Sequence, residues 1–191
     1  MARPREFDTD RAVERAMDLF WRQGFAATSL QDLTAELGIG SGSLYAAFGS
    51  KEGLYERALA AYCTGQAGEL VRNLEEAQEV RPALRSLLTG LMEADLAAPE
   101  RGCLLVNSAT ERAGHPATVA RVSATMRRVE SALTEALVRA RARGELASDK
   151  EPAALARFFT TFIQGLRVMG QARADRAFTE DAIDTALRAL D

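Results

Sequence analysis

The chain of 191 residues is poor in the side chains that most enzymes and metal sites use, with one histidine and two cysteines. Cys63 and Cys103 lack a CxxC spacing and do not make a disulfide framework, and His115 alone cannot complete a zinc site. The glycines within 38–42 follow a predicted helix rather than a strand, so they are not a dinucleotide-binding loop. We therefore expect no enzyme activity, no metal and no cofactor.

Aromatic residues and prolines are also scarce, at 6% of the chain and five residues, whereas alanine, leucine and arginine are frequent. This mix favours helices over sheets, so we predict an all-helical fold of about nine helices. No run of about 18 apolar residues occurs, so we expect no transmembrane helix and no membrane partner. The charged N-terminus lacks a signal-peptide pattern, which makes the cytoplasm the expected location.

An excess of positive charge is missing too. The net charge is −3, and residues 1–60 carry seven Lys or Arg against nine Asp or Glu. This balance argues mildly against nucleic-acid binding, so a DNA interface would have to depend on where individual charges lie.

The N-terminal part has the pattern of a helix-turn-helix. Apolar residues recur at helical spacing over residues 10–23, and Ser29, followed by Asp32, can cap a second helix. A glycine-containing turn at 38–40 leads to a third helix over about 41–48. Two short helices joined by such a tight turn are typical of DNA-binding proteins. The remaining helices are predicted over about 51–79, 82–97, 101–113, 116–143, 152–174 and 180–190.

The stretch GFAATSLQDLTAELGIGSGSLYAAFGSKEGLY at residues 24–55 closely resembles the DNA-binding segment of the TetR/AcrR repressor family. The resemblance is strong over about residues 8–60, and beyond that only helical layout and length match. It implies a DNA-binding domain over 1–55 and an effector-binding and dimerisation domain over 56–191. The matching features, without insertion, are Gly24-Phe25, Thr28-Ser29, Leu33, Gly38-Ile39, Gly42-Ser43-Leu44-Tyr45, Phe48, Ser50-Lys51-Glu52 and Leu54.

A set of DNA contacts follows from this resemblance. The small residues of the third helix let a recognition helix approach base edges, and the family contacts phosphates near the starts of the second and fourth helices and through a tyrosine. The alternatives are that Lys51 is only solvated, that Tyr45 packs on the first helix and that Ser41 only starts its helix. The residues concerned are Ser29, Gln31, Ser41, Gly42, Ser43, Tyr45 and Lys51.

Some positions depart from the family pattern or lie beside it. Ala47 stands where the family often has a phosphate-contacting His or Tyr, and Gly40 replaces the usual Ser or Thr cap. Arg3 and Arg5 lie on an arm that could reach the DNA backbone or the minor groove.

The resemblance also implies a homodimer and a pocket for a small, apolar effector in the second domain. We expect an apolar dimer face on the last two helices, with intrasubunit core as the alternative. This face comprises Phe158, Phe159, Phe162, Leu166 and Met169, with Ala186, Leu187 and Leu190 beside it. The residues expected to line the pocket, any of which could be plain core, are Tyr62, Met92, Cys103, Asn107, Met126 and Phe162.

Two further sites stay open at this point. Cys103 follows Arg101 and Gly102 at a predicted helix start, where a thiol pKa falls, so it is either a redox sensor or an inert buried cysteine. Glu111 and His115 would form a metal pair only if one helix ran through both.

The predicted function is a transcriptional repressor that binds a palindromic double-stranded operator as a homodimer and is released by its effector. An activator is also possible. The alternative from another class is a DNA-bound organiser or adaptor that lacks a small-molecule switch. One or two operators beside its own gene would favour the repressor, and many scattered sites would favour the organiser.

Overall fold

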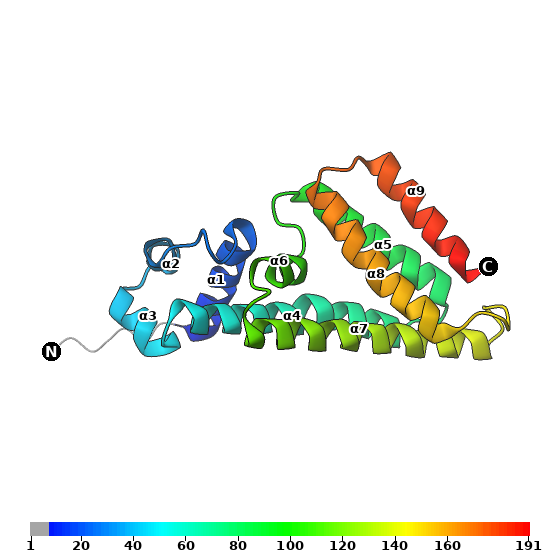
Figure 1. Ribbon diagram of the computed structural model, residues 1–191, viewed down its shortest axis with the longest axis horizontal. Coiled ribbons are helices and arrows are strands. Elements are labelled where there is room, and N and C mark those ends of the chain that lie inside the picture. The colour runs from blue at the N-terminus through cyan, green and yellow to red at the C-terminus, as the bar shows by residue number, and fades with distance from the viewer. Residues whose placement is uncertain (1–7) are drawn as a thin grey trace. The chain divides into compact units, whose positions relative to one another are not determined.

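The structure is a computed structural model that describes residues 8–191, so Arg3 and Arg5 lie outside the described residues. Within 8–191 the chain forms nine α-helices and a final 3₁₀ turn, Arg188–Leu190, and no strand, which confirms the all-helical prediction (Figure 1). The helices are α1 Thr9–Gln23, α2 Leu30–Leu37, α3 Ser41–Phe48, α4 Lys51–Glu75, α5 Val80–Ala97, α6 Leu104–Glu111, α7 Pro116–Ala142, α8 Pro152–Gln171 and α9 Arg176–Leu187.

The chain packs as two compact units, Met1–Cys63 and Thr64–Asp191, called here the first unit and the second unit. The division falls inside α4, later than the predicted domain boundary after residue 55. The functional division at that boundary stays a prediction.

The first unit is held together by α1, which packs against α2, and by α2, which packs against α3. Phe20 on α1 and Tyr55 on α4 are almost fully buried, and their rings meet edge to face with centroids 5.1 Å apart. Phe25 meets Tyr55 in the same manner at 5.0 Å. Burial of each large apolar side chain stabilises the fold by about 1.5–3 kcal/mol, so this aromatic cluster fixes α4 against α1.

The second unit has one apolar core, to which α5, α7, α8 and α9 all contribute, and α6 packs against α7 and α8. Figure 1 shows α5, α8 and α9 running side by side. The side chains at the centre of this core, Leu84, Leu88, Leu133, Leu137 and Phe159, have no exposed surface.

Two helices of the second unit begin earlier than predicted because a polar side chain pairs with their first backbone N–H groups. The N–H of Val80 donates to Oε2 of Glu145 at 2.8 Å, which lets α5 start before Pro82. The N–H of Phe178 donates to Oδ1 of Asp175 at 2.8 Å, so α9 starts at Arg176 rather than near residue 180. Three other predicted helices are too long, since α4 ends at Glu75, α6 spans only Leu104–Glu111 and α8 ends at Gln171.

Most of the predicted dimer face turns out to be core. Phe159 and Leu166 on α8 are buried, and so are three residues at the end of the chain, Ala186, Leu187 and Leu190. The prediction that these five residues lie on the surface was wrong, because they face the apolar interior of their own unit. Within the part of the chain that the structure describes, no helix has both the length and the apolar character needed to cross a bilayer.

Candidate nucleic-acid interface

The start of α2 is closed by the predicted capping box. The hydroxyl of Ser29 accepts from the N–H of Asp32 at 3.0 Å, and the N–H of Ser29 donates to Oδ2 of Asp32 at 2.8 Å. The Ser29 hydroxyl also donates to the same carboxylate at 2.6 Å. These bonds from Ser29, first through its hydroxyl and then through its N–H, hold the pKa of the Asp32 carboxyl below its ordinary value. Both donors of Ser29 are therefore engaged, and a phosphate contact from Ser29 would require Asp32 to release one.

The start of α3 is open. Gly38 ends α2 with φ of 68°, a left-handed conformation that glycine adopts without steric cost, and Gly40 precedes Ser41 without any side-chain cap. The first N–H groups of a helix have no partner within the helix, so they and the positive end of the helix dipole attract anions. Ser41, Gly42 and Ser43 are all exposed on this first turn.

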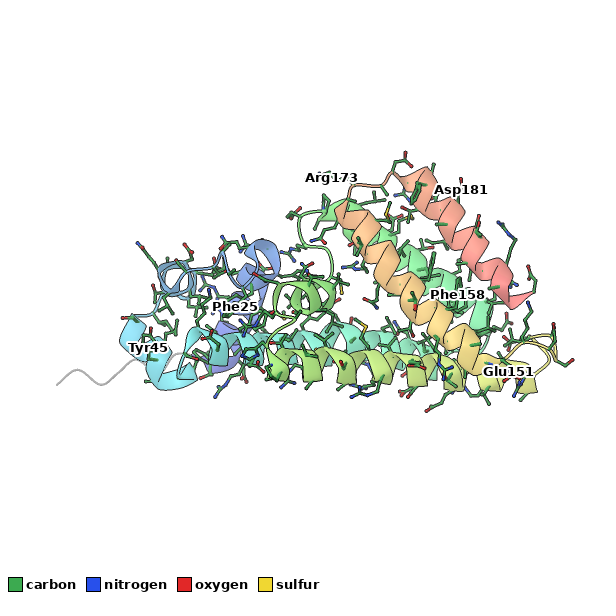
Figure 2. All side chains as sticks on the ribbon, in the orientation of Figure 1. Phe25, Tyr45, Glu151, Phe158, Arg173 and Asp181 are labelled. Carbon is green, nitrogen blue, oxygen red and sulfur yellow. The ribbon has the colours of Figure 1, made fainter. Side chains whose placement is uncertain are left out.

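Other predicted contacts lie on the surface of the same unit. Gln31 is exposed at the second position of α2, and Tyr45 on α3 is 46% exposed (Figure 2). Leu44 and Phe48 of α3 are buried, so the residues of this helix are divided between core and solvent. Ala47 is half-buried on α3 and has no polar group to offer.

Lys51 begins α4 directly after a capping serine. The hydroxyl of Ser50 accepts from the N–H of Gly53 at 3.0 Å, as the sequence predicts for a helix start. The ammonium of Lys51 lies 4.3 Å from the centre of the Phe25 ring, a cation–π contact that holds the charge beside the start of the helix. Lys51 also lowers the pKa of Asp32 through its charge, after the two Ser29 bonds. The starts of α2 and α4 are therefore close enough to interact electrostatically.

Two residues that the sequence analysis did not single out shape this region. A Cβ placed on Gly53 would lie 2.1 Å from the carbonyl oxygen of Phe48, so only glycine fits where α4 passes the end of α3. The guanidinium of Arg57, one turn further along α4, lies 5.3 Å from the centre of the Phe48 ring. Gly53 follows the Ser50-Lys51-Glu52 run, and a glycine inside a predicted helix was the available signal for a close backbone approach.

Part of the negative charge of the first unit is paired inside the unit. Glu36 on α2 lies 3.5 Å from Arg15 and 3.9 Å from Arg22, both on α1, and Arg22 also pairs with Asp18 at 3.1 Å. These exposed pairs contribute about 0–1 kcal/mol each, so they matter more for where charge lies than for stability. They neutralise Glu36, which lowers the local repulsion of a phosphate backbone.

The predicted effector residues have different local surroundings, and their role in effector binding stays a prediction. Tyr62 belongs to the first unit, where its ring meets Trp21 edge to face at 4.9 Å. Met92 is buried in the core of the second unit, and Met126 is half-buried on α7. Phe162 stacks on Phe158 with ring centroids 6.0 Å apart, on the side of α8 that carries exposed apolar residues.

The two remaining residues predicted to line the pocket lie at the start of α6 and within it. Cys103 is buried at the position before α6, and the amide of Asn107 donates from Nδ2 to the carbonyl of Arg101 at 3.1 Å. A depression of about 250 Å³ lies at the start of α5, and none of the six predicted residues lines it. Its lining residues are Glu79, Val80, Arg81, Pro82, Glu145, Leu146 and Leu190.

Among residues 8–191 no group of three or more His, Cys, Asp or Glu side chains is arranged to hold a metal ion. Glu111 ends α6, and His115 precedes α7, so no single helix carries both residues. Nδ1 of His115 instead lies 3.2 Å from the hydroxyl of Thr118.

Two family profiles match the chain. One, described as bacterial regulatory proteins of the tetR family, matches residues 12–58, and one described as the tetracyclin repressor-like C-terminal domain matches residues 81–186. The chain is 34% identical over 195 residues to an uncharacterised HTH-type transcriptional regulator of Bacillus subtilis strain 168, YezE, with 100% of both chains covered. It is 30% identical over 189 residues to the HTH-type transcriptional repressor ComR of Escherichia coli K12, with 97% of this chain and 90% of ComR covered.

Solved structures show the same fold. A cysteine mutant of the TetR family transcriptional regulator CifR, complexed with a 26-bp double-strand operator DNA, is 38% identical, with 99% of this chain and 100% of that chain covered and a TM-score of 0.85. A TetR family regulator from Cytophaga hutchinsonii, at only 19% identity, superimposes with a TM-score of 0.81 over 97% of this chain and 96% of its own.

Proposed function

The chain belongs to the TetR family of bacterial transcriptional regulators, and from that premise we propose that it is a repressor. In this proposal a dimer binds a palindromic operator through the first unit of each protomer, and a small molecule bound in the second unit releases the DNA. The observation that carries the proposal is the open, exposed start of α3, with Ser41, Gly42 and Ser43 on its first turn.

The division of α3 between core and solvent supports its insertion into a major groove. Small side chains at the helix start allow the backbone to approach base edges, and the uncapped N–H groups can donate to DNA. Tyr45 and Lys51 offer a hydroxyl and an ammonium at the edges of this surface, where phosphates would pass. The CifR relative, which has been solved with operator DNA, supports the same use of the first unit here.

A row of exposed apolar residues on α8 supports a dimer. Phe158, Val168 and Met169 are between 39% and 45% exposed, and Phe178 at the start of α9 is 52% exposed. Large apolar side chains gathered on one surface mark association sites, and Gly165 in the same row lets a partner helix approach. Two recognition helices about 34 Å apart, or a multiple of that distance, would then read a palindrome.

The proposal is tested by selecting genomic fragments that the purified protein binds in the presence of competitor DNA. We expect one or a few palindromic sites, near the gene for this protein, and a change of the selected sequence in the Ser41→Ala and Ser43→Ala variants. Phe158→Glu should convert the dimer to monomers in sedimentation experiments and weaken operator binding, while the exposed Val138→Glu on α7 serves as a matched control. Many scattered, unrelated sites would contradict a repressor and favour a DNA-bound organiser.

A further inference from the structure

One side of α8 carries four polar residues in a row, called here the α8 polar row: Arg157, Thr160, Gln164 and Arg167. Their spacing of three and four residues places them on the same side of the helix, along about 15 Å of its axis. Arg157 is largely exposed, whereas Arg167 is buried. The row therefore runs from the surface of the second unit into its interior.

The two ends of the row are occupied by internal partners. Nε of Arg157 donates to Oε1 of Glu130 on α7 at 3.2 Å. Arg167 pairs with Oδ1 of Asp95 on α5 at 2.8 Å and also donates to the carbonyl oxygens of Leu91 and Gly102. Each end therefore already has an internal partner of opposite charge.

The middle of the row is not satisfied. The hydroxyl oxygen of Thr160 and Oε1 of Gln164 are both shielded from solvent, and neither has a hydrogen-bond partner among the described residues. Nearly all buried polar groups in proteins are paired, because an unpaired one loses its hydration without compensation. Two such atoms lie one helical turn apart, between ends of the row that are paired, which makes them candidates for contact with a molecule outside the chain.

A third unpaired atom marks where the site stops. Oδ2 of Asp95 is also buried without a partner, but Gly170 covers it, since a Cβ at that position would lie 2.6 Å from the oxygen. No ligand can approach Asp95 from that side. The unpaired oxygens that remain in the row are therefore those of Thr160 and Gln164, both on uncharged side chains.

We propose that Thr160 and Gln164 form the polar end of the effector site and that they bind an uncharged molecule bearing an O–H or N–H donor, such as an alcohol or an amide. This inference rests on the proposed function and refines its effector, which the sequence predicted only as small and apolar. Gln164 accepts a hydrogen bond from the ligand, and the Thr160 hydroxyl donates to or accepts from the same group. An anion would lose its hydration at a site whose side chains are uncharged, and is disfavoured.

The test compares isomeric probes on the full-length protein without DNA. 1-Butanol and diethyl ether are isomers, but only the alcohol can donate a hydrogen bond. Butyramide tests an N–H donor, and butyrate tests a negative charge. We expect 1-butanol and butyramide to bind about 2–10-fold more tightly than diethyl ether, with butyrate weakest, and to shift the side-chain amide NMR signals of Gln164. In the wild-type protein, the donors should also weaken binding of the selected operator.

Matched variants separate a binding site from a packing defect. Thr160→Val and Gln164→Met remove the unpaired atoms at similar volume, so each should abolish the preference for donors and raise Tm by about 2–4 °C. Thr161→Val is the control, because the hydroxyl of Thr161 is exposed and already donates to the carbonyl of Arg157 at 2.9 Å; it should change neither quantity.

Three results would overturn the inference: a lower Tm for both variants, equal binding of alcohol and ether, or a crystal structure in which water completes both atoms and the probes do not displace it. A protein that discriminates between the probes but binds no operator would refute the proposed function and leave this site standing. Operator binding without discrimination would refute this site alone.

Discussion

Helix starts in the first unit, except that of α3, are capped by neighbouring side chains, whereas most helix starts in the second unit are not. Asp8, Ser29 and Ser50 each accept hydrogen bonds from N–H groups of the helix that follows them. In the second unit α6, α7 and α8 have no side-chain cap, and α5 relies on Glu145, 65 residues further along the chain. The helix starts of the first unit are thus set mainly by local sequence, and those of the second unit depend more on packing between distant segments.

The two units also differ in where their unused polar groups lie. In the first unit the start of α3 is exposed and has no side-chain cap. In the second unit the unpaired oxygens of Thr160 and Gln164 are buried on α8, and that of Asp95 is buried on α5. An exposed helix start suits a large, charged partner such as DNA, and buried uncharged oxygens suit a small molecule.

The largest effect expected from this contrast concerns the ion pair between Arg167 and Asp95, in which both side chains are buried. Arg167→Met leaves Asp95 as a buried, uncompensated carboxylate, which should cost about 3–5 kcal/mol of stability. Arg22→Met, which breaks exposed pairs of the first unit, should cost about 1 kcal/mol or less. Urea denaturation measures both, and similar losses would mean that the two units do not differ in this respect.

A charge at the start of α3 is the next largest test. Gly42→Glu places a carboxylate among the N–H groups proposed to face DNA, and nothing lies within 4 Å of a Cβ there, so the fold should survive. We expect operator affinity to fall about 100-fold or more, which corresponds to about 2.7 kcal/mol. Gly90→Glu, at an equally open and exposed glycine of α5, adds the same charge to the second unit and should leave affinity within about twofold. Fluorescence anisotropy with circular dichroism as a folding check measures this, and equal losses from both variants would point to net charge alone.

The chain's two lysines, Lys51 and Lys150, allow a smaller comparison of the same kind. Lys51→Ala should weaken binding to all DNA sequences by a similar factor, about 3–10-fold, and reduce the slope of log K against log salt concentration by about 1 for each protomer. Lys150→Ala in the second unit should change neither. A change in which operator is selected would show that Lys51 reads bases and not phosphate.

The smallest effect is an opposite response of two carboxyls to pH. Hydrogen bonds from Ser29 lower the pKa of Asp32, so their stabilisation is complete at neutral pH and is lost as the pH falls through that lowered pKa. Burial raises the pKa of Asp95 although Arg167 opposes it, so the penalty of its charge is relieved as the pH falls through the raised pKa. Carbon-13 NMR titration should place the two midpoints on opposite sides of the ordinary aspartate value. Ser29→Ala should move only the Asp32 midpoint, and a common midpoint in the wild type would be inconsistent with both causes.

The same contrast explains what could be predicted from the sequence. Ser29 with Asp32, the glycine turn at 38–40 and the capping Ser50 gave the correct positions of α2, α3 and the start of α4, because each signal acts within a few residues. The contacts with DNA that these helices make stay predictions.

In the second unit local signals were insufficient. Phe158 and Phe159 are adjacent and chemically identical, yet one is 42% exposed and the other fully buried. Periodicity shows that a helix has an apolar face but not whether its own unit or a partner covers that face, which is why Leu187 and Leu190 were misplaced. The pairing of Arg167 with Asp95 joins two helices distant in sequence and had no local signal.

The absence of a side chain at Gly53 has a mechanical consequence. A Cβ at this position would overlap the carbonyl of Phe48, so the backbones of the end of α3 and the first turn of α4 are in close contact. The ring of Phe48, buried and covered by Arg57 of α4, ties the same two helices together a second time. Any tilt of the first turn of α4 should then move α3 with it as a rigid body. A regulator that works in this way would release DNA by reorienting α3 and not by unfolding it.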